Sequence, residues 1–353
     1  DGMPPQAAID ALVASATTPG NHAYQNYKGL PAFREAIAGW YSRFYGVNLN
    51  PNGGIQPLVG SKEGILLISM AYVNPGDKVL VPDPGYPTYT SASNLVEAEV
   101  LTYDLKEENG WLPDFDALEA MDLEGVKIMW VNYPNMPTGA KATPELYQKL
   151  VDFALRHRIL LVNDNPYSFI LTGKPVSMLA AKGAEECCLE LNSLSKAHNM
   201  SGWRIGMVCG APELISEVLK VKSQMDSGMF KALQLAAVQA LEQGQEWFDE
   251  LNAEYSCRRE RAGRIFDLLG ARYNPDTAGL FLWGRIDRKY ATAAMTAGEA
   301  LSERILHEAG VFITPGFIFG KNGQDYIRIS LCAKPELLDK AFAKIEKAKD
   351  RIL

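Results

Sequence analysis

Short apolar runs that alternate with helical segments constrain the fold of this chain more than any other feature of its sequence. Each run has four to six residues and is rich in Val, Ile, Leu or Met, with no regular alternation of polar residues. Strands that are buried on both faces of a parallel sheet have this pattern. The runs are residues 78–81, 126–131, 159–162, 187–191 and 205–209.

Segments with helical periodicity lie between these runs, at residues 62–73, 114–121, 144–157 and 212–225. Several begin with a helix start signal, such as Ser61 or Thr143-Pro144. Strand and helix in alternation predict an α/β domain, with a mostly parallel central sheet and helices on both faces. After a helical stretch at about 233–269, short strands at 280–283 and 326–330 predict a smaller α+β domain.

The length of 353 residues is that of about two domains. We expect a large α/β domain at residues 30–240 and a small α+β domain at residues 241–353. Residues 1–29 are expected to form an N-terminal segment that belongs to the small domain or to an arm. The sequence starts at Asp1 without a methionine, so we expect it to begin inside the natural sequence.

Composition excludes several classes of protein. Hydrophobic residues make up 47% and charged residues 22%, which is typical of a globular chain and not of a disordered one. The net charge is −7, so no basic surface is expected for nucleic acid. The longest apolar stretch, residues 65–73, is far shorter than the ~20 residues that span a bilayer. Nucleic acid and membrane are therefore not expected as partners.

The cysteines and histidines indicate neither a disulfide framework nor a metal site. Five cysteines lack any C-x-x-C spacing, and the four histidines have no spacing typical of metal ligands. Free thiols in so long a chain favour a reducing compartment, so we expect a cytoplasmic protein without a metal.

The residues that follow the predicted strands carry the chemistry, because ligands bind at the carboxyl ends of strands in open parallel sheets. Asp164 follows one strand, and the hydroxyls of Ser193 and Ser195 follow another together with Lys196. Arg204 precedes the last apolar run. Hydroxyls and a guanidinium suit a phosphate, and a lysine amine can form an imine with an aldehyde.

Three features near the predicted strand ends have ordinary alternatives. Asp164 could cap a helix or a turn, or it could pair with a buried cation. The proline-rich run at residues 82–89 could present Tyr86 as a flat platform, or it could be a simple turn. The Gly60-Ser61-Lys62 helix start offers an anion site, although many helices begin in this way.

Taken together, the motifs resemble those of the fold-type I pyridoxal-phosphate enzymes, and specifically of the class I/II aminotransferases. The matching segments appear in the family's order over nearly the whole chain. The most specific is Ser193-Leu194-Ser195-Lys196 with Gly202-Trp203-Arg204. The others are Pro82-x-Pro84-x-Tyr86-Pro87-x-Tyr89, Pro137-Thr138-Gly139, Asp164-Asn165-Pro166-Tyr167 and Tyr326-Ile327-Arg328-Ile329-Ser330.

The resemblance implies transfer of an amino group between an L-amino acid and a 2-oxo acid, in ping-pong fashion, with pyridoxal 5'-phosphate as cofactor. Lys196 would hold the cofactor as an aldimine and then shuttle the substrate proton. Asp164 would keep the pyridine nitrogen protonated, and Tyr167 would donate to the phenolic oxygen. Arg328 would bind the substrate α-carboxylate through two parallel hydrogen bonds.

The resemblance also implies contacts around the cofactor. Tyr86 would stack on its ring. Tyr24 matches the tyrosine that reaches the phosphate from the other subunit, which implies a homodimer with shared active sites. The phosphate group would be bound by Ser61, the amide of Lys62, Ser193, Ser195 and Arg204.

The sequence departs from the family pattern where the family usually carries Asn directly before Pro-Thr-Gly. Met136 occupies that position and cannot donate a hydrogen bond to the cofactor. Asn135 is therefore a candidate replacement, or Tyr167 acts alone. The Met136-Pro137 bond is a candidate for the cis form.

Other functions sharing these motifs stay open at this point. A carbon–sulfur lyase or another eliminating relative would use the same lysine, aspartate and arginine. A regulator built on this fold would carry an additional DNA-binding module. Residues 316–321 resemble a P-loop but are one residue short and lack the following Ser or Thr, so we reject that reading. His198 is expected at the surface or behind the site, because Lys196 already serves as the base.

Overall fold

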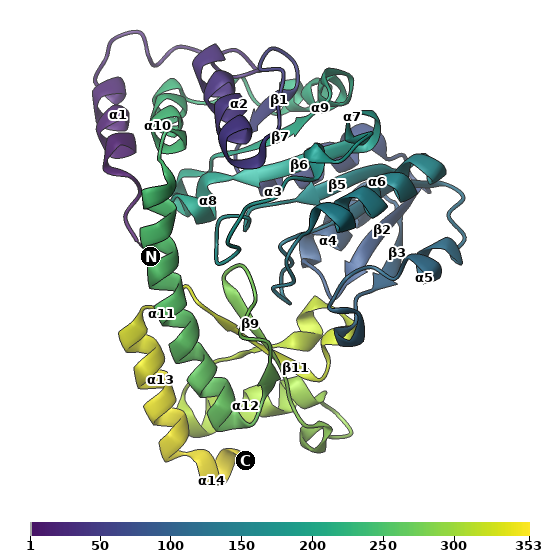
Figure 1. Cartoon of the computed structure of the whole chain (residues 1–353), viewed down its shortest axis with the longest axis vertical. Helices are drawn as coiled ribbons and strands as arrows, with labels where there is room; N and C mark the ends of the chain where they lie inside the picture. The colour runs from purple at the N-terminus through teal and green to yellow at the C-terminus, as the bar shows by residue number, and fades with distance from the viewer. Residues whose placement is uncertain (1) are drawn as a thin grey trace.

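The apolar runs form the middle of a seven-stranded sheet in the computed structural model, which describes residues 2–353 (Figure 1). The strand order is β1-β7-β6-β5-β4-β2-β3. The strands are β1 (Ile55–Leu58), β2 (Lys78–Asp83), β3 (Glu99–Asp104), β4 (Val126–Val131), β5 (Leu160–Asp164), β6 (Cys188–Ser193) and β7 (Gly206–Gly210). All neighbouring pairs from β3 to β6 are parallel.

Helices cover both faces of this sheet, which explains why its strands are continuously apolar. Val79 and Val81 pack with one group of helices, whereas Leu80 between them packs with the other. One face carries α3 (Ser61–Tyr72), α4 (Pro87–Leu95) and α9 (Pro212–Met225). The other carries α2 (Pro31–Tyr45), α5 (Phe115–Glu119), α6 (Pro144–His157) and α10 (Lys231–Leu241). The predicted fold class is thereby confirmed.

Strand β7 differs from the pattern that its apolar run indicates. It pairs antiparallel with β6 on one side and with β1 on the other. Only residues 194–205 connect β6 to β7, and they contain the short helix α8 (Leu194–Ala197) and one 3₁₀ turn. A parallel connection usually crosses back over the sheet through a full helix, and this connection holds only a four-residue helix and a 3₁₀ turn. The chain therefore turns back and brings residues 193–204 to the end of the sheet.

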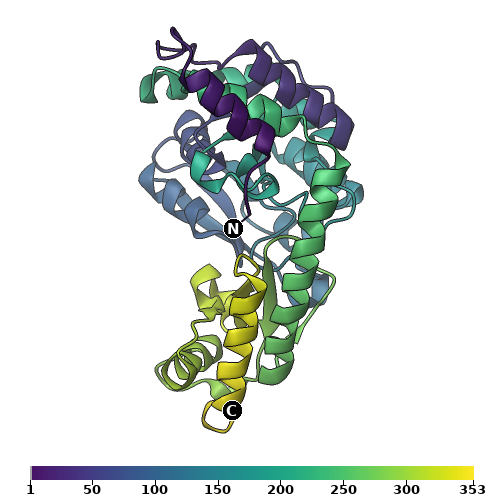
Figure 2. The ribbon, with the colours of Figure 1, turned by 90° about the vertical axis from the view of Figure 1, so that its left-hand side faces the viewer.

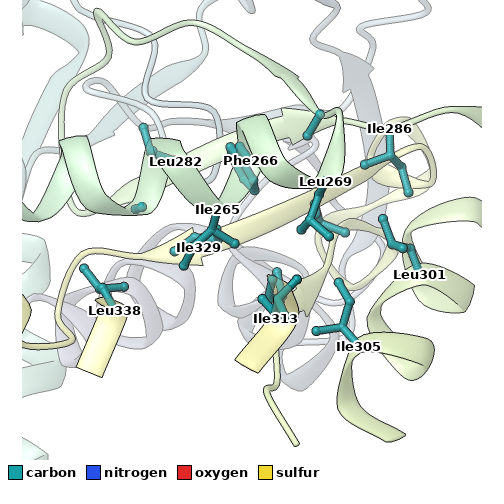
Figure 3. Close-up of a cluster of buried hydrophobic side chains, with 14 of the residues drawn as sticks. Ile265, Phe266, Leu269, Leu282, Ile286, Leu301, Ile305, Ile313, Ile329 and Leu338 are labelled. Atoms are coloured by element: carbon teal, nitrogen blue, oxygen red, sulfur yellow. The ribbon is translucent and has the colours of Figure 1, made fainter. Parts of the chain in front are cut away.

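The second domain is built on a four-stranded antiparallel sheet with the order β10-β11-β9-β8. Its strands are β8 (Arg272–Tyr273), β9 (Phe281–Arg285), β10 (Thr314–Pro315) and β11 (Tyr326–Ser330). Its helices are α11 (Gln245–Leu269), α12 (Ala297–Ala309), α13 (Pro335–Lys347) and α14 (Lys349–Ile352). Figure 3 shows their shared core, in which Phe266 and Leu269 of α11 meet Leu282, Leu301 and Ile329.

The expectation of one helical stretch over residues 233–269 is wrong in detail. Helix α10 ends at Leu241, and α11 starts after Gly244. Helix α10 packs with β1 and β7. Helix α11 adds Phe248 to that same core at its start and then runs down to the second sheet (Figure 2). The N-terminal helix α1 (Gln6–Ala16) packs against α10. The domain boundaries at residues 30 and 241 stay predictions.

Two further observations concern the whole described chain. Within residues 2–353, no helix combines the length and the apolar character that crossing a membrane requires. All five cysteine thiols are free, although Cys187 and Cys188 lie next to each other with their sulfur atoms 3.8 Å apart.

Candidate active site

A cavity of about 310 Å³ lies where the parallel strands of the large sheet end and the second domain begins. Residues from β5, the β6–β7 connection, the start of α3 and strand β11 line it together. Ten of the twelve predicted site residues lie on its wall: Ser61, Lys62, Tyr86, Asp164, Tyr167, Ser193, Ser195, Lys196, Arg204 and Arg328. Asn135 and Tyr24 do not.

One end of the cavity is built for an anion. The Ser193 hydroxyl donates to the Ser195 hydroxyl at 2.8 Å and accepts from the Ser195 amide at 3.0 Å. The Arg204 guanidinium donates to the carbonyl of Ser201 at 2.8 Å and lies against Gly60, directly before α3. Gly60 has φ +79°, and a Cβ there would lie 2.9 Å from Arg204 Cζ. The missing side chain therefore lets the guanidinium approach the amide end of α3, which attracts anions.

Asp164 is a buried carboxylate that faces the cavity with one oxygen unsatisfied. The residue is only 5% exposed, and its Oδ2 accepts a 2.9 Å hydrogen bond from the Tyr89 hydroxyl. Oδ1 is buried and has no hydrogen-bond partner among residues 2–353. Burial raises the pKa of Asp164 to about 6, although the bond from Tyr89 lowers it. A cationic N–H donor at Oδ1 would relieve this desolvation.

Tyr89 is a site residue that the sequence reasoning did not select. It stacks on Trp130 with ring centroids 5.3 Å apart, and it meets the ring of Tyr86 edge-on at 5.7 Å. Tyr89 thus orients both the platform ring of Tyr86 and the carboxylate of Asp164. The signal was present in the Pro-Gly-Tyr-Pro-x-Tyr motif, because residues three apart at a helix start share one face.

Lys196 lies in α8 directly after β6, on the same cavity wall as Asp164. In the part of the chain that the structure describes, its Nζ makes neither a hydrogen bond nor an ion pair. A lysine that is free of carboxylates and lines a cavity has its amine available for reaction with a carbonyl carbon.

Arg328 lies at the opposite end of the cavity, between two aromatic rings. Its Cζ is 4.0 Å from the ring centroid of Phe281 and 4.6 Å from that of Phe319. Nη1 contacts the Met136 sulfur at 3.4 Å, and Nε is buried without a partner among the described residues. Burial lowers the pKa of Arg328 to about 10, so the guanidinium stays charged at neutral pH. We call the side chains of Arg328, Phe281, Phe319 and Met136 the Arg328 cage.

The departure at Met136 changes this end of the cavity. The Met136-Pro137 bond is cis, and Met136 lines the cavity beside Arg328. Asn135 does not replace the missing amide there. Its side chain donates to the carbonyl of Asn132 and accepts from the amide and the hydroxyl of Thr138, so its polar atoms are used within the turn.

Two other predicted residues lie away from the cavity. Tyr24 is 91% exposed. His198 is fully buried behind the site, between the rings of Trp40 and Phe248. Burial lowers the pKa of His198 to about 3, so the ring is neutral. The surface alternative for His198 is therefore wrong, and it supports the Lys196 segment by packing.

The donor set of this cavity fits pyridoxal phosphate. An anion site, an aromatic face, an amine and a buried carboxylate with a free oxygen line one cavity. These are the groups needed for a phosphate, a pyridine ring, an aldehyde carbon and a protonated ring nitrogen, respectively.

The comparisons with known proteins agree with this geometry. A family model described as aminotransferase class I and II matches residues 1–345. LL-diaminopimelate aminotransferase of Dehalococcoides mccartyi is 40% identical over 98% of this chain and 88% of that protein. The protein of the same name from Moorella thermoacetica is 40% identical over 99% of this chain and 88% of its own length. The apo structure of BacF from Bacillus subtilis superposes with a TM-score of 0.93 at 36% identity, covering 98% of this chain and 92% of that chain.

Proposed function

The chain belongs to the class I and II aminotransferases, and from that membership we propose which of its residues perform the reaction and which amino acid it uses. It is a pyridoxal-phosphate-dependent aminotransferase, which moves an amino group between an amino acid and a 2-oxo acid. The eliminating alternative is not favoured, because relatives matched over nearly the whole chain are named aminotransferases.

Pyridoxal phosphate, when bound, supplies a ring that accepts the electron pair released when the substrate loses its α-proton. Lys196 Nζ would take that proton from the substrate α-carbon and deliver it to the former aldehyde carbon of the cofactor, on the far side of the nitrogen. Asp164 Oδ1 would accept a hydrogen bond from the ring nitrogen and so keep that nitrogen protonated. The unsatisfied Oδ1, on the same cavity wall as the free amine of Lys196, is the observation that carries this assignment.

Other residues hold the two ends of the reacting system in place. Ser61, the Lys62 amide, Ser193, Ser195 and Arg204 bind the phosphate, and Tyr86 covers the ring. Tyr167 donates its hydroxyl hydrogen to the phenolic oxygen, and neither Met136 nor Asn135 offers an amide for that oxygen. Tyr167 is a suitable donor, since burial raises the pKa of its hydroxyl well above the ordinary value.

Arg328 binds the substrate α-carboxylate. A guanidinium that is largely removed from water and has no carboxylate partner in residues 2–353 is a strong site for an anion. Holding the carboxylate fixes the direction of the α-hydrogen toward Lys196.

Arg328→Gln is expected to lower kcat/KM for the amino acid by about 100-fold, since two charge-assisted hydrogen bonds are lost. Steady-state kinetics at saturating cofactor would measure the change. Arg288→Gln is the matched control, because Arg288 is exposed and pairs with Asp325 outside the cavity. Equal kinetics in the two variants would remove Arg328 from carboxylate binding.

The amino donor is LL-diaminopimelate and the acceptor is 2-oxoglutarate. Support for the donor comes from the relatives named LL-diaminopimelate aminotransferase, which match this chain at 38–40% identity. The acceptor is proposed from the family resemblance alone. A single-turnover spectral screen tests this directly. The bound cofactor changes colour when it accepts an amino group, so LL-diaminopimelate, aspartate, methionine and phenylalanine can be ranked by their half-reaction rates. A faster half-reaction with aspartate, methionine or phenylalanine would overturn the proposal that LL-diaminopimelate is the amino donor.

The functional unit is a homodimer in the cytoplasm. Tyr24 is 91% exposed and does not line the cavity of its own chain, which suits a residue that completes the site of a second copy. The five free thiols are compatible with a reducing compartment.

Tyr24→Phe is expected to raise the dissociation constant of pyridoxal phosphate by about tenfold, because one hydrogen bond to a charged phosphate is lost. Absorbance titration of cofactor-free protein measures this constant. The control is Tyr27→Phe, which changes a half-exposed tyrosine in the same segment. Sedimentation should give about twice the chain mass of 38.8 kDa, and an active monomer would contradict the proposal.

A further inference from the structure

The Arg328 cage depends on a loop of the second domain that is tied to the end of β2 in the first. We propose that Asp83, the last residue of β2, is a positioning residue for the amino-acid substrate. By holding residues 319–322, it keeps Phe319 against Arg328 and so fixes the guanidinium that receives the substrate carboxylate. The inference rests on the proposed role of Arg328.

Hydrogen bonds connect this loop to β2 at several points. Asp83 Oδ2 accepts from the amide of Lys321 at 3.2 Å, and Oδ1 accepts from the amide of Asn322 at 3.1 Å. The Asn322 side chain donates to the Asp83 carbonyl at 3.0 Å. The amide of Gly85 donates to the carbonyl of Phe319 at 2.8 Å. These hydrogen bonds therefore hold the loop on both sides of Gly320.

Gly320 shows how closely the loop is fitted to the carboxylate. It has φ +136°, a conformation that side chains rarely adopt, and a Cβ there would lie 2.6 Å from Asp83 Cγ. No other residue type would let the backbone approach Asp83 in this way. The loop is thus shaped around the carboxylate rather than merely close to it.

The loop in turn determines where Arg328 lies. Phe319 contacts the guanidinium on one face and meets Trp283 edge-on at 5.9 Å. Arg328 has no carboxylate or carbonyl partner among the described residues, so its position depends on the two rings and on the Met136 sulfur. If the loop moved away, the Arg328 cage would lose the ring of Phe319.

Asp83 is buried, so its bonds to the loop are shielded from water, unlike those of an ordinary surface residue. The residue is only 6% exposed, and burial raises the pKa of its carboxyl group, while the two backbone bonds lower it. The neighbouring Asp104 is different. It is more exposed and reaches only side chains of the loop, namely Asn322 at 2.9 Å and Lys321 at 3.5 Å. Asp104→Asn is therefore the matched control for Asp83→Asn.

Asp83→Asn keeps the size of the side chain but cannot accept from both amides. L-glutamate, the amino form of the proposed acceptor 2-oxoglutarate, serves as the substrate. We expect its apparent dissociation constant in the half-reaction to rise about tenfold, with the limiting rate within threefold of wild type. The dissociation constant of pyridoxal phosphate should stay within twofold. Hydrogen exchange of the Lys321 and Asn322 amides should accelerate about tenfold, which reports loss of the tie independently of activity. Asp104→Asn should change none of these values by more than twofold.

The double variant Asp83→Asn, Arg328→Gln tests whether Asp83 acts through Arg328. If it does, adding Asp83→Asn to Arg328→Gln weakens L-glutamate binding no further. Fully additive effects would overturn the inference, as would unchanged glutamate binding in Asp83→Asn or an equal loss of cofactor binding. If Arg328→Gln alone leaves glutamate binding intact, the proposed role of Arg328 fails instead.

Discussion

Lys196→Ala is expected to reduce turnover by about 10⁴-fold. On its proposed role, the variant loses both the amine that reacts with the cofactor aldehyde and the base that moves the α-proton, and each function alone is worth orders of magnitude in rate. Among the described residues, the cavity wall holds one other lysine amine. Lys62, the other lysine that lines the cavity, is at the start of α3 and lies at the phosphate end.

Lys62→Ala is the matched control, because it removes a cavity lysine but keeps the backbone amide that is proposed to bind phosphate. Its kcat should stay within about tenfold of wild type. Borohydride reduction of the wild-type protein, followed by peptide mapping, should place the chromophore on the peptide that contains Lys196. A label on Lys62, or turnover by Lys196→Ala near that of Lys62→Ala, would refute the assignment.

Asp164→Asn is expected to lower kcat by about 10³-fold while the protein still binds the cofactor. The substitution keeps the shape of the side chain and the hydrogen bond with Tyr89, but it removes the negative charge that is proposed to hold the ring nitrogen protonated. Rapid-kinetic measurement of both half-reactions would show the loss. Half-reaction rates near those of wild type would exclude this role.

The same substitution should stabilise the cofactor-free protein at neutral pH. Asp164 has its pKa raised to about 6, so the folded state holds the proton more tightly than the unfolded state. Ionising the buried carboxyl therefore lowers the free energy of unfolding of the wild-type protein. This loss of stability is absent at low pH, where Asp164 is protonated in both states, and it grows as pH rises from about 4 to about 6. A shift of this size corresponds to about 3 kcal/mol.

Urea unfolding of the two cofactor-free proteins at pH 4 and pH 8 would measure this penalty. The free energy of unfolding of Asp164→Asn relative to wild type should increase by about 2.4 kcal/mol between the two pH values. Asp116→Asn, at an exposed helix position, should show no such change. A difference that does not vary with pH would mean that Asp164 is not desolvated.

The strands of the large sheet could be predicted because their signal is local. Continuous apolar runs at 126–131 and 78–81 mark strands covered on both faces, and the structure places β4 and β2 there. Some of the site residues could be chosen for a related reason. Asp164 ends β5 and Lys196 follows β6, and the carboxyl ends of parallel strands meet at one edge. Arg328 lies in the middle of β11 and is recognised only from its family motif.

Other features depend on residues that are far apart along the chain, and no local pattern predicts them. The antiparallel direction of β7, the bond from Tyr89 to Asp164 and the tie between Asp83 and the loop at 319–322 all arise when distant segments pack. Periodicity and motif spacing describe a residue's own segment, so they predict strands, helices and the chemistry that each loop carries. Which of those groups touch, and which stay unpaired, is set by three-dimensional packing, because burial and hydrogen bonding depend on neighbours that the local sequence does not contain.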